Sequence, residues 1–355
     1  MMSSTLQNKK ASGWPAQRRS RRRHHLGLTL VELMVAMAIS TFVVLAAITA
    51  LIIARQGFTS VDAESQLREN ARFVTEVLQR IGVQVGFLDV QYAATPVPPS
   101  TDSLAADPPP NVFGLNNSSR GTSDAWNAGS ARSSGTLGYG SDILVMRFQV
   151  AEAPWRTASG PTSDGAVIDC SGNTITALPA DRYDRMVSIL HVITSDDGEP
   201  ALACSRTDAS GTLGEPQPLI SGVENFQVLY GVDGIGPGNT AAPAASAVDT
   251  VPERYLRADQ LTVSGNTAAT NANWRQVRSI RVGMVLRGPV GSAVDNSSRT
   301  LYPLGGAAAG ASAAAGSAFV STNDPGTAFS APQDGRLRQT VTFTIHLRNA
   351  QVEKR

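Results

Sequence analysis

The sequence predicts an α+β protein, in which a long N-terminal helix, membrane-spanning over its first half, packs on an antiparallel β-sheet domain. Three observations predict this arrangement. Residues 28–54 form a nearly uninterrupted apolar run, residues 55–82 continue with the apolar spacing of an amphipathic helix, and residues 83–355 hold short segments of the strand type. We therefore expect four parts: a basic leader over 1–27, a span over 28–54, its amphipathic continuation over 55–82 and a β-rich domain over 83–355.

The leader carries a strong positive charge. It holds seven of the chain's 30 basic residues and none of its 29 acidic ones, so residues 28–355 keep 23 basic residues and are mildly acidic. A polybasic arm can bind nucleic acid or anionic lipid. Because this arm stands directly before an apolar run, we interpret it as a topology signal that keeps the leader cytoplasmic. The acidic remainder argues against direct nucleic-acid binding by the domain.

Residues 28–54 are long enough to cross a membrane. The stretch LTLVELMVAMAISTFVVLAAITALIIA has one charged residue, Glu32, and contains neither Gly nor Pro. At 1.5 Å per residue it makes roughly 40 Å of helix, against a hydrocarbon core of about 30 Å. A cleaved secretory signal has a shorter apolar core followed by small residues. We therefore expect a single span that the mature protein retains.

Glu32 is the exceptional residue of this span. A charged side chain near the middle of a bilayer costs at least roughly 2.5–3.5 kcal/mol, so an acid in such a segment is a functional candidate. Two interpretations stay open. Glu32 meets an opposite charge, or its side chain reaches the interface from the cytoplasmic end of the helix.

The helix is expected to continue beyond the membrane. After residue 54 the sequence becomes polar, but apolar side chains recur at spacings of three and four, which places them on one face of a helix. Gly82 is a plausible stop signal. The second half should therefore lie on the globular domain through Leu67, Ala71, Val74, Leu78 and Ile81.

Five segments of the remaining chain predict strands, because each is rich in β-branched and aromatic residues. They are residues 142–150, 185–194, 223–232, 277–288 and 339–349. The last two alternate strictly, which predicts one core face and one wet face. The expected core side chains are Ile280, Val282, Met284 and Leu286 in one and Val341, Phe343, Ile345 and Leu347 in the other. The Gly-, Ala-, Ser- and Pro-rich stretches between strands are expected to be loops.

Cys170 and Cys204 are the only two cysteines. An even pair in a domain that follows a membrane span favours a disulfide over a metal site. Two unpaired buried thiols are the alternative.

Few residues point to catalysis or to a cofactor. Beyond the leader, His191 and His346 each fall within a strand pattern, and neither a nucleophile with its base nor a phosphate-binding loop is recognisable. We expect neither an enzyme nor a cofactor. The one weak metal candidate is a calcium site in a glycine-rich loop, with an ordinary polar turn as the alternative. Its oxygen ligands would be Asp233, Asn239, Asp249 and Glu253.

The N-terminal pattern resembles the class III signal of type IV prepilins and pseudopilins. It combines the basic leader, Gly27, the stretch LTLVEL with an acid five residues after that glycine, and the long apolar run. The resemblance implies that prepilin peptidase cleaves between Gly27 and Leu28 and that Leu28 is then N-methylated. It also implies that Glu32 neutralises the N-terminal amine of a neighbouring subunit. Leu28 departs from the family, where Phe is usual.

The globular part is similar to the PilW-type minor pilins of type IV pili. The similarity rests on the order of GSDILVMRF, GEPALACSR, LISGVENFQVLYGVD, RYLRADQL, NWRQVRSIRVGMVLR and DGRLRQTVTFTIHLRN. It implies a pilin-like fold and a minor pilin that primes pilus assembly near the filament tip. The implied location is the inner membrane with a periplasmic domain, and later the pilus on the cell surface. The implied partners are other minor pilins, the major pilin, the prepilin peptidase, the inner-membrane assembly platform and a tip adhesin.

Two other functions stay open at this point. The signal and layout are also similar to those of a type II secretion pseudopilin. Alternatively, the insertions over residues 96–140 and 233–250 form a tip-located binding or adhesion module.

Overall fold

A computed structural model describes residues 27, 29–94, 107–155, 160–207, 212–238, 250–293, 295, 297–305, 318–349 and 351. The chain divides into two compact units, Met1–Ala54 and Arg55–Arg355. One continuous helix, α1 (Leu30–Gly82), passes from the first unit into the second and is long and apolar enough to cross a membrane. Every residue from Leu30 to Ala54 is exposed. The first half of α1 therefore presents apolar side chains on all sides, as expected of a segment whose solvent is lipid.

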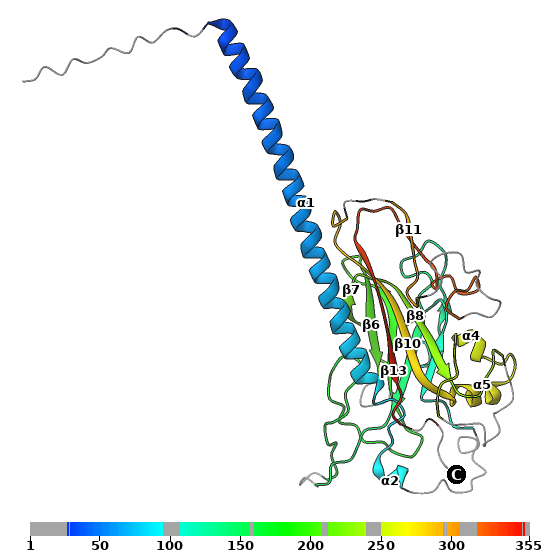
Figure 1. Ribbon diagram of the computed structural model, residues 1–355. Coiled ribbons are helices and arrows are strands. Elements are labelled where there is room, and N and C mark those ends of the chain that lie inside the picture. Colours follow the sequence, from blue (N-terminus) through cyan, green and yellow to red (C-terminus); the bar gives the residue numbers. More distant parts are fainter. Residues whose placement is uncertain are drawn as a thin grey trace, which may run out of the picture. The chain divides into compact units, whose positions relative to one another are not determined.

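The second half of α1 is amphipathic. Its predicted buried stripe is confirmed and begins one turn earlier than predicted, at Ala63. The opposite side of the same half exposes Phe58, Val61 and Phe73. Figure 1 shows this half lying along the sheets of the second unit. One side of the helix thus belongs to the domain core, and the other side is open.

Gly82 ends α1 where the sequence predicts, and its small size matters there. A Cβ built on Gly82 would collide with the Ile345 side chain, so the end of the helix lies directly against a strand. The chain then turns through Gly86, which has a φ of 75° and donates its N–H to the Arg147 carbonyl. The short helix α2 (Val90–Ala93) follows, and the Asp89 side chain caps it by accepting from the Gln91 N–H.

All five predicted strands are confirmed, each within about three residues at either end. They are β4 (Ile143–Phe148), β5 (Met186–Thr194), β8 (Val223–Val232), β10 (Val277–Arg287) and β13 (Arg338–His346). The shorter elements were not predicted from the sequence. They are β1 (Val112–Leu115), β2 (Ser118–Ser119), β3 (Ser130–Ala131), β6 (Pro200–Arg206), β7 (Gln217–Ser221), β9 (Arg254–Leu256), β11 (Arg299–Leu301), β12 (Phe329–Ala331), α4 (Ala258–Leu261) and α5 (Thr267–Trp274).

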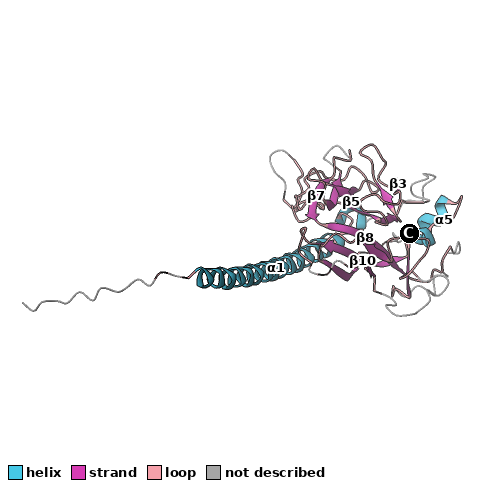
Figure 2. Ribbon diagram, turned by 90° about the horizontal axis from the view of Figure 1, so that it is seen from above, coloured by secondary structure: helices cyan, strands magenta, loops and turns pink. Residues whose placement is uncertain are grey.

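The strands form two main antiparallel sheets. One has the order β1-β4-β5-β6-β7, and the other has the order β13-β10-β8-β9. In the second sheet Val282 stands opposite Phe343 on one side and Val228 on the other. Figure 2 shows the sheets as neighbouring layers, with β5 and β7 in one and β8 and β10 in the other. The α+β class predicted from the sequence is confirmed.

The wet face predicted for β10 is wrong. Ser279, Gly283 and Val285 are buried, because the chain folds back over that face of the strand. A Cβ on Gly283 would collide with the Pro303 carbonyl, and Leu304 packs with Leu229 in a small apolar cluster there. In β13 the prediction holds better, since Thr340, Thr342 and His346 are exposed.

One hydrophobic core joins α1 to both sheets. It contains Leu67, Val74, Leu78 and Ile81 from the helix, Leu144, Leu190 and Leu202 from the first sheet, and Phe226, Val228, Ile280 and Met284 from the second. Because both sheets contribute, the second half of α1 is part of the domain's folding unit.

We expect Leu78→Ala to lower the free energy of unfolding by roughly 2–5 kcal/mol, because it removes a fully buried side chain from this core. Phe73→Ala, on the exposed side of the same helix, is the matched control and should change stability little. Denaturant titration of the full chain in detergent measures both. Equal losses in the two variants would contradict the assigned core face.

Candidate assembly site

The first turn of α1 gives Glu32 a local partner. The Thr29 N–H and hydroxyl each lie 3.4 Å from Oε2 of Glu32, and the Glu32 N–H donates to the Thr29 hydroxyl at 3.2 Å. This reciprocal pairing is a capping box, which satisfies backbone groups that a helix leaves free at its N-terminus. Gly27 is exposed two residues earlier, and Leu28 lies outside the described residues. The carboxylate thus accepts the N–H of Thr29, the residue that follows the predicted new N-terminus at Leu28.

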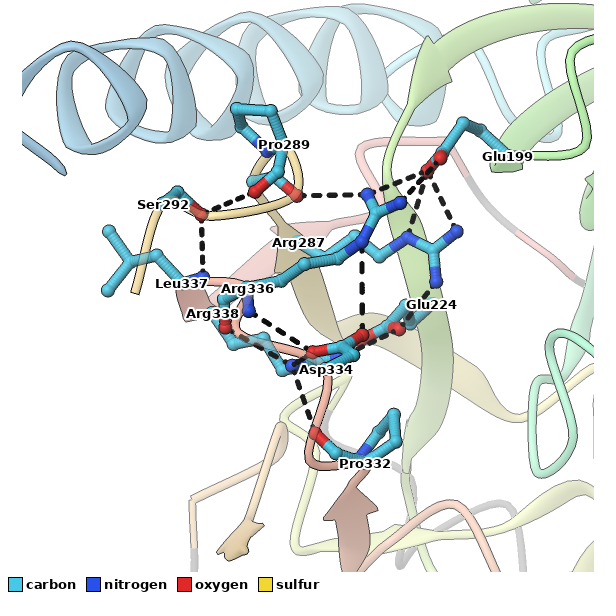
Figure 3. A network of polar contacts seen from close by, with 11 residues as sticks. Glu199, Glu224, Arg287, Pro289, Ser292, Pro332, Asp334, Arg336, Leu337 and Arg338 are labelled. Atoms are coloured by element: carbon cyan, nitrogen blue, oxygen red, sulfur yellow. Dashed lines mark hydrogen bonds and ion pairs between the residues drawn. The ribbon is translucent and has the colours of Figure 1, made fainter. Parts of the chain in front are cut away.

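A partly buried network of charged side chains joins the strand ends at the end of the domain where α1 begins its contact. Arg287 contacts Glu199 at 2.8 Å and Glu224 at 3.0 Å. Arg338 pairs with Glu224 at 2.6 Å and with Asp334 at 2.7 Å (Figure 3). These contacts tie the start of β6 to β8, β10 and β13.

Arg336 completes the network from the loop before β13. It reaches Glu199 at 2.9 Å and also donates to the Gly288 carbonyl at 3.1 Å. Burial opposes ionisation of Glu199, but hydrogen bonds from Arg336 and Arg287 outweigh it and lower the pKa of that carboxyl. Breaking such a network would leave charges unpaired, which costs free energy. The network therefore holds the strand ends in one arrangement.

A tight turn, Pro289–Ser292, stands on this network and touches α1. The Ser292 N–H donates to the Pro289 carbonyl at 3.2 Å, and the Ser292 hydroxyl accepts from the Leu337 N–H at 2.8 Å. The Ser60 hydroxyl of α1 donates to the Ser292 carbonyl at 2.7 Å. Figure 3 shows the turn between the network and the helix.

A cleft of about 660 Å³ lies beside this turn, between α1 and the segments on either side of β11 and β12. Its exposed rim includes ion pairs between Arg68 and Glu64 and, at 2.9 Å, between Arg299 and Asp295. Exposed pairs of this kind add little stability. Their charges therefore stay available to a partner surface.

Two buried carboxyl groups meet in a second polar cluster. The Asn116 amide donates to Asp142 at 3.4 Å and to Asp324 at 2.8 Å, and each aspartate is 1% exposed. Asp142 also accepts the Val228 N–H at 2.9 Å. Burial, and then the charge of Asp324, raises the pKa of Asp142 well above its usual range. Burial raises the pKa of Asp324 to about 6.

The structure joins the two predicted disulfide residues. Cys170 and Cys204 form a disulfide with their Cα atoms 5.7 Å apart, and both are buried in the domain. Cys204 belongs to β6, so the bond ties this strand to the loop that precedes β5.

Of the four calcium candidates, the structure describes Asp233 and Glu253. Asp233 is fully buried; it accepts the Thr250 N–H at 2.9 Å and lies 3.7 Å from Arg278. Glu253 accepts the Gly234 N–H at 3.3 Å. Asn239 and Asp249 lie outside the described residues. Within the part of the chain that is described, no three His, Cys, Asp or Glu side chains are placed to hold a metal.

The two histidines occupy different surroundings. His191 is buried, with Nε2 3.0 Å from the Ser205 hydroxyl, and burial, then Arg132 and Arg120, lowers its pKa to about 4. His346 is exposed on β13. His191 is thus a buried side chain of β5 that pairs through Nε2, while its Nδ1 is buried without a hydrogen-bond partner among the described residues.

Comparisons with known proteins identify both parts of the chain. Residues 189–349 match the family model described as Type IV Pilus-assembly protein W, and residues 22–48 match the prokaryotic N-terminal methylation motif. Residues 189–349 are therefore similar to the PilW family. The resemblance stated from the sequence is confirmed, and the PilW match and the motif support a structural role of the pilin type, with membrane association and contact with other pilus components.

A solved type IV-like pilin from Thermus thermophilus is similar at 14% identity, with a TM-score of 0.38, over 81% of this chain and 98% of that one. No curated protein matches the chain. The matched PilW region begins within β5 and ends just beyond β13, so it includes the charged network and the turn.

We expect the contribution of Asp324 to the free energy of unfolding to fall as the pH rises from about 4 to about 6. Asp324 binds its proton more tightly when folded, so its stabilising contribution is full below the unfolded pKa of 3.8 and is lost by about 6. The loss is on the order of 3 kcal/mol. Denaturant titrations across this range measure the slope.

Asp324→Asn should flatten that slope, whatever it does to stability at a single pH. Asp197→Asn is the control, because this exposed carboxyl has a pKa lowered by the Glu199 N–H. An unchanged slope in Asp324→Asn would show that other groups set the pH dependence.

Proposed function

We propose that this chain is a minor pilin of a type IV pilus, which helps to prime assembly and sits at or near the filament tip. The observation that carries the proposal is the joint presence of a methylation motif and a region similar to the PilW family in one chain. The apolar half of α1, exposed on all sides, supplies the surface that neighbouring subunits' helices would cover, first in the membrane and then in the filament. The inner membrane with a periplasmic domain is the proposed starting location.

The proposed maturation site lies directly before the capping box. Prepilin peptidase would cleave between Gly27 and Leu28 and methylate Leu28. The new amine would then stand one residue before the Thr29 N–H that Glu32 accepts. In assembly, Glu32 would turn from its own helix end to the amine of a neighbouring subunit, because a full positive charge is the stronger partner in a low dielectric.

The proposed partners are other minor pilins, the major pilin, the peptidase and the inner-membrane assembly platform. The family description names pilus assembly, which favours the pilus over a type II secretion system. The energy for assembly would come from a partner, because we assign this chain a structural and not an enzymatic role.

The first test is the intact mass and N-terminal sequence of the protein in membranes with and without the peptidase. We expect a chain that begins at methylated Leu28 only when the peptidase is present. An uncut chain in both membranes would make this a plain single-span protein and would end the pilin proposal.

The second test separates the two partners of Glu32. Glu32→Gln keeps a side chain that can serve in a capping box but removes the charge, and we expect it to be absent from sheared filaments. Thr29→Val removes the hydroxyl of the cap but keeps Glu32, and it should enter filaments nearly as well as wild type. If Thr29→Val fails as badly as Glu32→Gln, the local cap and not the charge governs assembly.

A further inference from the structure

β13 is the outermost strand of the second sheet, and its outer edge is long and regular. It pairs with β10 over nine residues without a register shift, and no other described strand pairs with it (Figure 1). Between Arg338 and Arg348 the sequence has no Pro and no acidic or basic residue other than His346. Natural sheets usually shorten, bend or charge their edges, which prevents unwanted pairing. β13 has none of these protections.

The edge strands at the other ends of the two main sheets are different. β1 has four residues and β9 has three. β7 has five residues, contains Pro218 and meets β6 with a register shift. The length and regularity of β13 are therefore a particular feature of this edge.

Every second residue of β13 points its backbone N–H and C=O away from β10. At one end of the ladder the Gly288 N–H donates to the Leu337 carbonyl at 2.8 Å, and at the other end the Leu347 N–H donates to the Arg278 carbonyl at 2.9 Å. Because hydrogen-bonded pairs alternate in an antiparallel ladder, the odd-numbered residues from 339 to 345 bond to β10. The central outward-pointing residues, whose backbone groups have no partner among the described residues, are Thr340, Thr342 and Thr344.

The cleft beside the Pro289–Ser292 turn opens onto this edge. Its lining includes the first two residues of β13, several residues within 60–68 of α1, and β11. α1 packs on the face of β13 that carries Val341 and Phe343, whereas the Thr342 hydroxyl on the opposite face donates to the Pro303 carbonyl at 2.5 Å. Because the cleft touches elements on both faces and the strand between them, the edge of β13 forms its floor.

A second copy of this chain is poorly suited to this edge. Paired strands lie about 4.8 Å apart, and each copy would bring α1 on one flank of its edge and β11 on the other. A two-fold antiparallel pairing centred on Thr342 would also place Arg336 of one copy opposite Arg348 of the other, and like charges directly opposite each other are destabilising. A single extended segment meets neither obstacle, because it needs only the width of one strand.

The side chains around the edge define the chemistry of such a segment. Val341 and Phe343 are half-buried, so apolar side chains on the same face of an added strand would cover them. The opposite face exposes Thr340 and Thr342, which suits polar side chains. Arg348, just past the end of β13, is exposed and has no ion-pair partner among the described residues. An acid at that end of the segment would therefore be favoured.

We propose that the outer edge of β13 binds one extended segment of another pilus component as an additional strand. The segment alternates apolar and polar side chains, is uncharged along Thr340–Thr344 and has an acid at the end beside Arg348. Main-chain hydrogen bonds supply its affinity, and its side chains supply the choice of partner. The open edge belongs to the domain alone, whereas the source of the segment in a pilus component rests on the proposed function.

Hydrogen exchange of the full chain in detergent tests whether the edge is open. Read at single amides, the N–H groups of Thr340, Thr342 and Thr344 should exchange rapidly, and those of Val341 and Phe343, which bond to β10, should exchange slowly. Slow exchange at the three threonines would mean that the domain itself covers the edge, and the inference would be wrong.

Cross-linking in cells that make the pilus proteins tests the occupant. A photoreactive amino acid replaces Thr340 or Thr344, one position at a time. We expect both positions to cross-link to one short segment of one pilus protein, at residues about four apart, because an added strand runs alongside β13 with the same rise per residue.

Thr340→Pro and Thr340→Val form the matched pair for the backbone contact. Proline removes the outward N–H without removing a bond to β10, whereas valine keeps that N–H. With the photoreactive group at 344, Thr340→Pro should lower the cross-link yield roughly five- to ten-fold, and Thr340→Val should leave it nearly unchanged. Denaturant titration checks that both variants fold, and if Thr340→Pro does not, the identity of the cross-linked residues decides.

Several outcomes would overturn the inference. They are cross-links from the two positions to unrelated segments, cross-links to a second copy of this chain or to a protein outside the pilus, no cross-link from either position, and equal yields in the two folded variants. The same cells without the prepilin peptidase separate this inference from the proposed function. Cross-links to one segment there, with the chain uncut in both kinds of cell, would support strand addition although the maturation proposal fails.

Discussion

The structure depends on one helix whose two halves need different surroundings: an apolar environment for the first half and the domain core for the second. Over Leu30–Ala54 every side of α1 is apolar and exposed, whereas beyond Ala54 only the stripe from Ala63 to Ile81 is buried. The change from one pattern to the other occurs without a break in the helix. Because both sheets pack on the buried stripe, the domain cannot form its core without this part of the anchor.

Contacts at both ends of this stripe fix the domain along the helix. Near its start, Ser60 binds the turn after β10, and at its end Gly82 fits against Ile345 of β13. The first contact is polar and needs a hydroxyl, and the second is steric and needs the absence of a side chain. Between these two contacts, β10 and β13 run alongside this half of the helix (Figure 1).

Two polar clusters, one partly buried and one fully buried, fix the sheets in different ways. The network of Arg287, Arg336 and Arg338 with Glu199, Glu224 and Asp334 balances its charges, so its contribution depends little on pH near neutrality. The Asp142–Asp324 pair has only an amide between its carboxyl groups, and its stability contribution changes with pH. The charged network fixes the positions of the strand ends. The Asp142–Asp324 pair holds the segment that covers the outer face of β8 and β10.

The sequence predicted the regular elements well because each leaves a periodic pattern. The stripe on α1 and the five long strands were recognisable, as was the stop at Gly82. The buried outer face of β10 was not, since alternation shows which side chains share a face and not what covers it. The charged network joins residues from 199 to 338, a separation that no local pattern reports. The Thr29–Glu32 capping box, by contrast, leaves a local T-x-x-E pattern, but the apolar surroundings of Glu32 favoured a distant partner in the prediction.

The capping box gives the Glu32 carboxylate a local hydrogen-bond partner that a stronger, charged partner could replace. A capping interaction is worth about 1 kcal/mol, whereas a carboxylate within the hydrocarbon costs at least roughly 2.5–3.5 kcal/mol. The local cap therefore offsets only part of the cost, and the carboxylate still gains from meeting a full positive charge. In the proposed assembly, such a residue would exchange its own helix end for a neighbour's amine without first becoming wholly unpaired. The proposed cleavage before Leu28 would place such an amine next to the cap, and one carboxylate would then serve the helix end before assembly and registration during it.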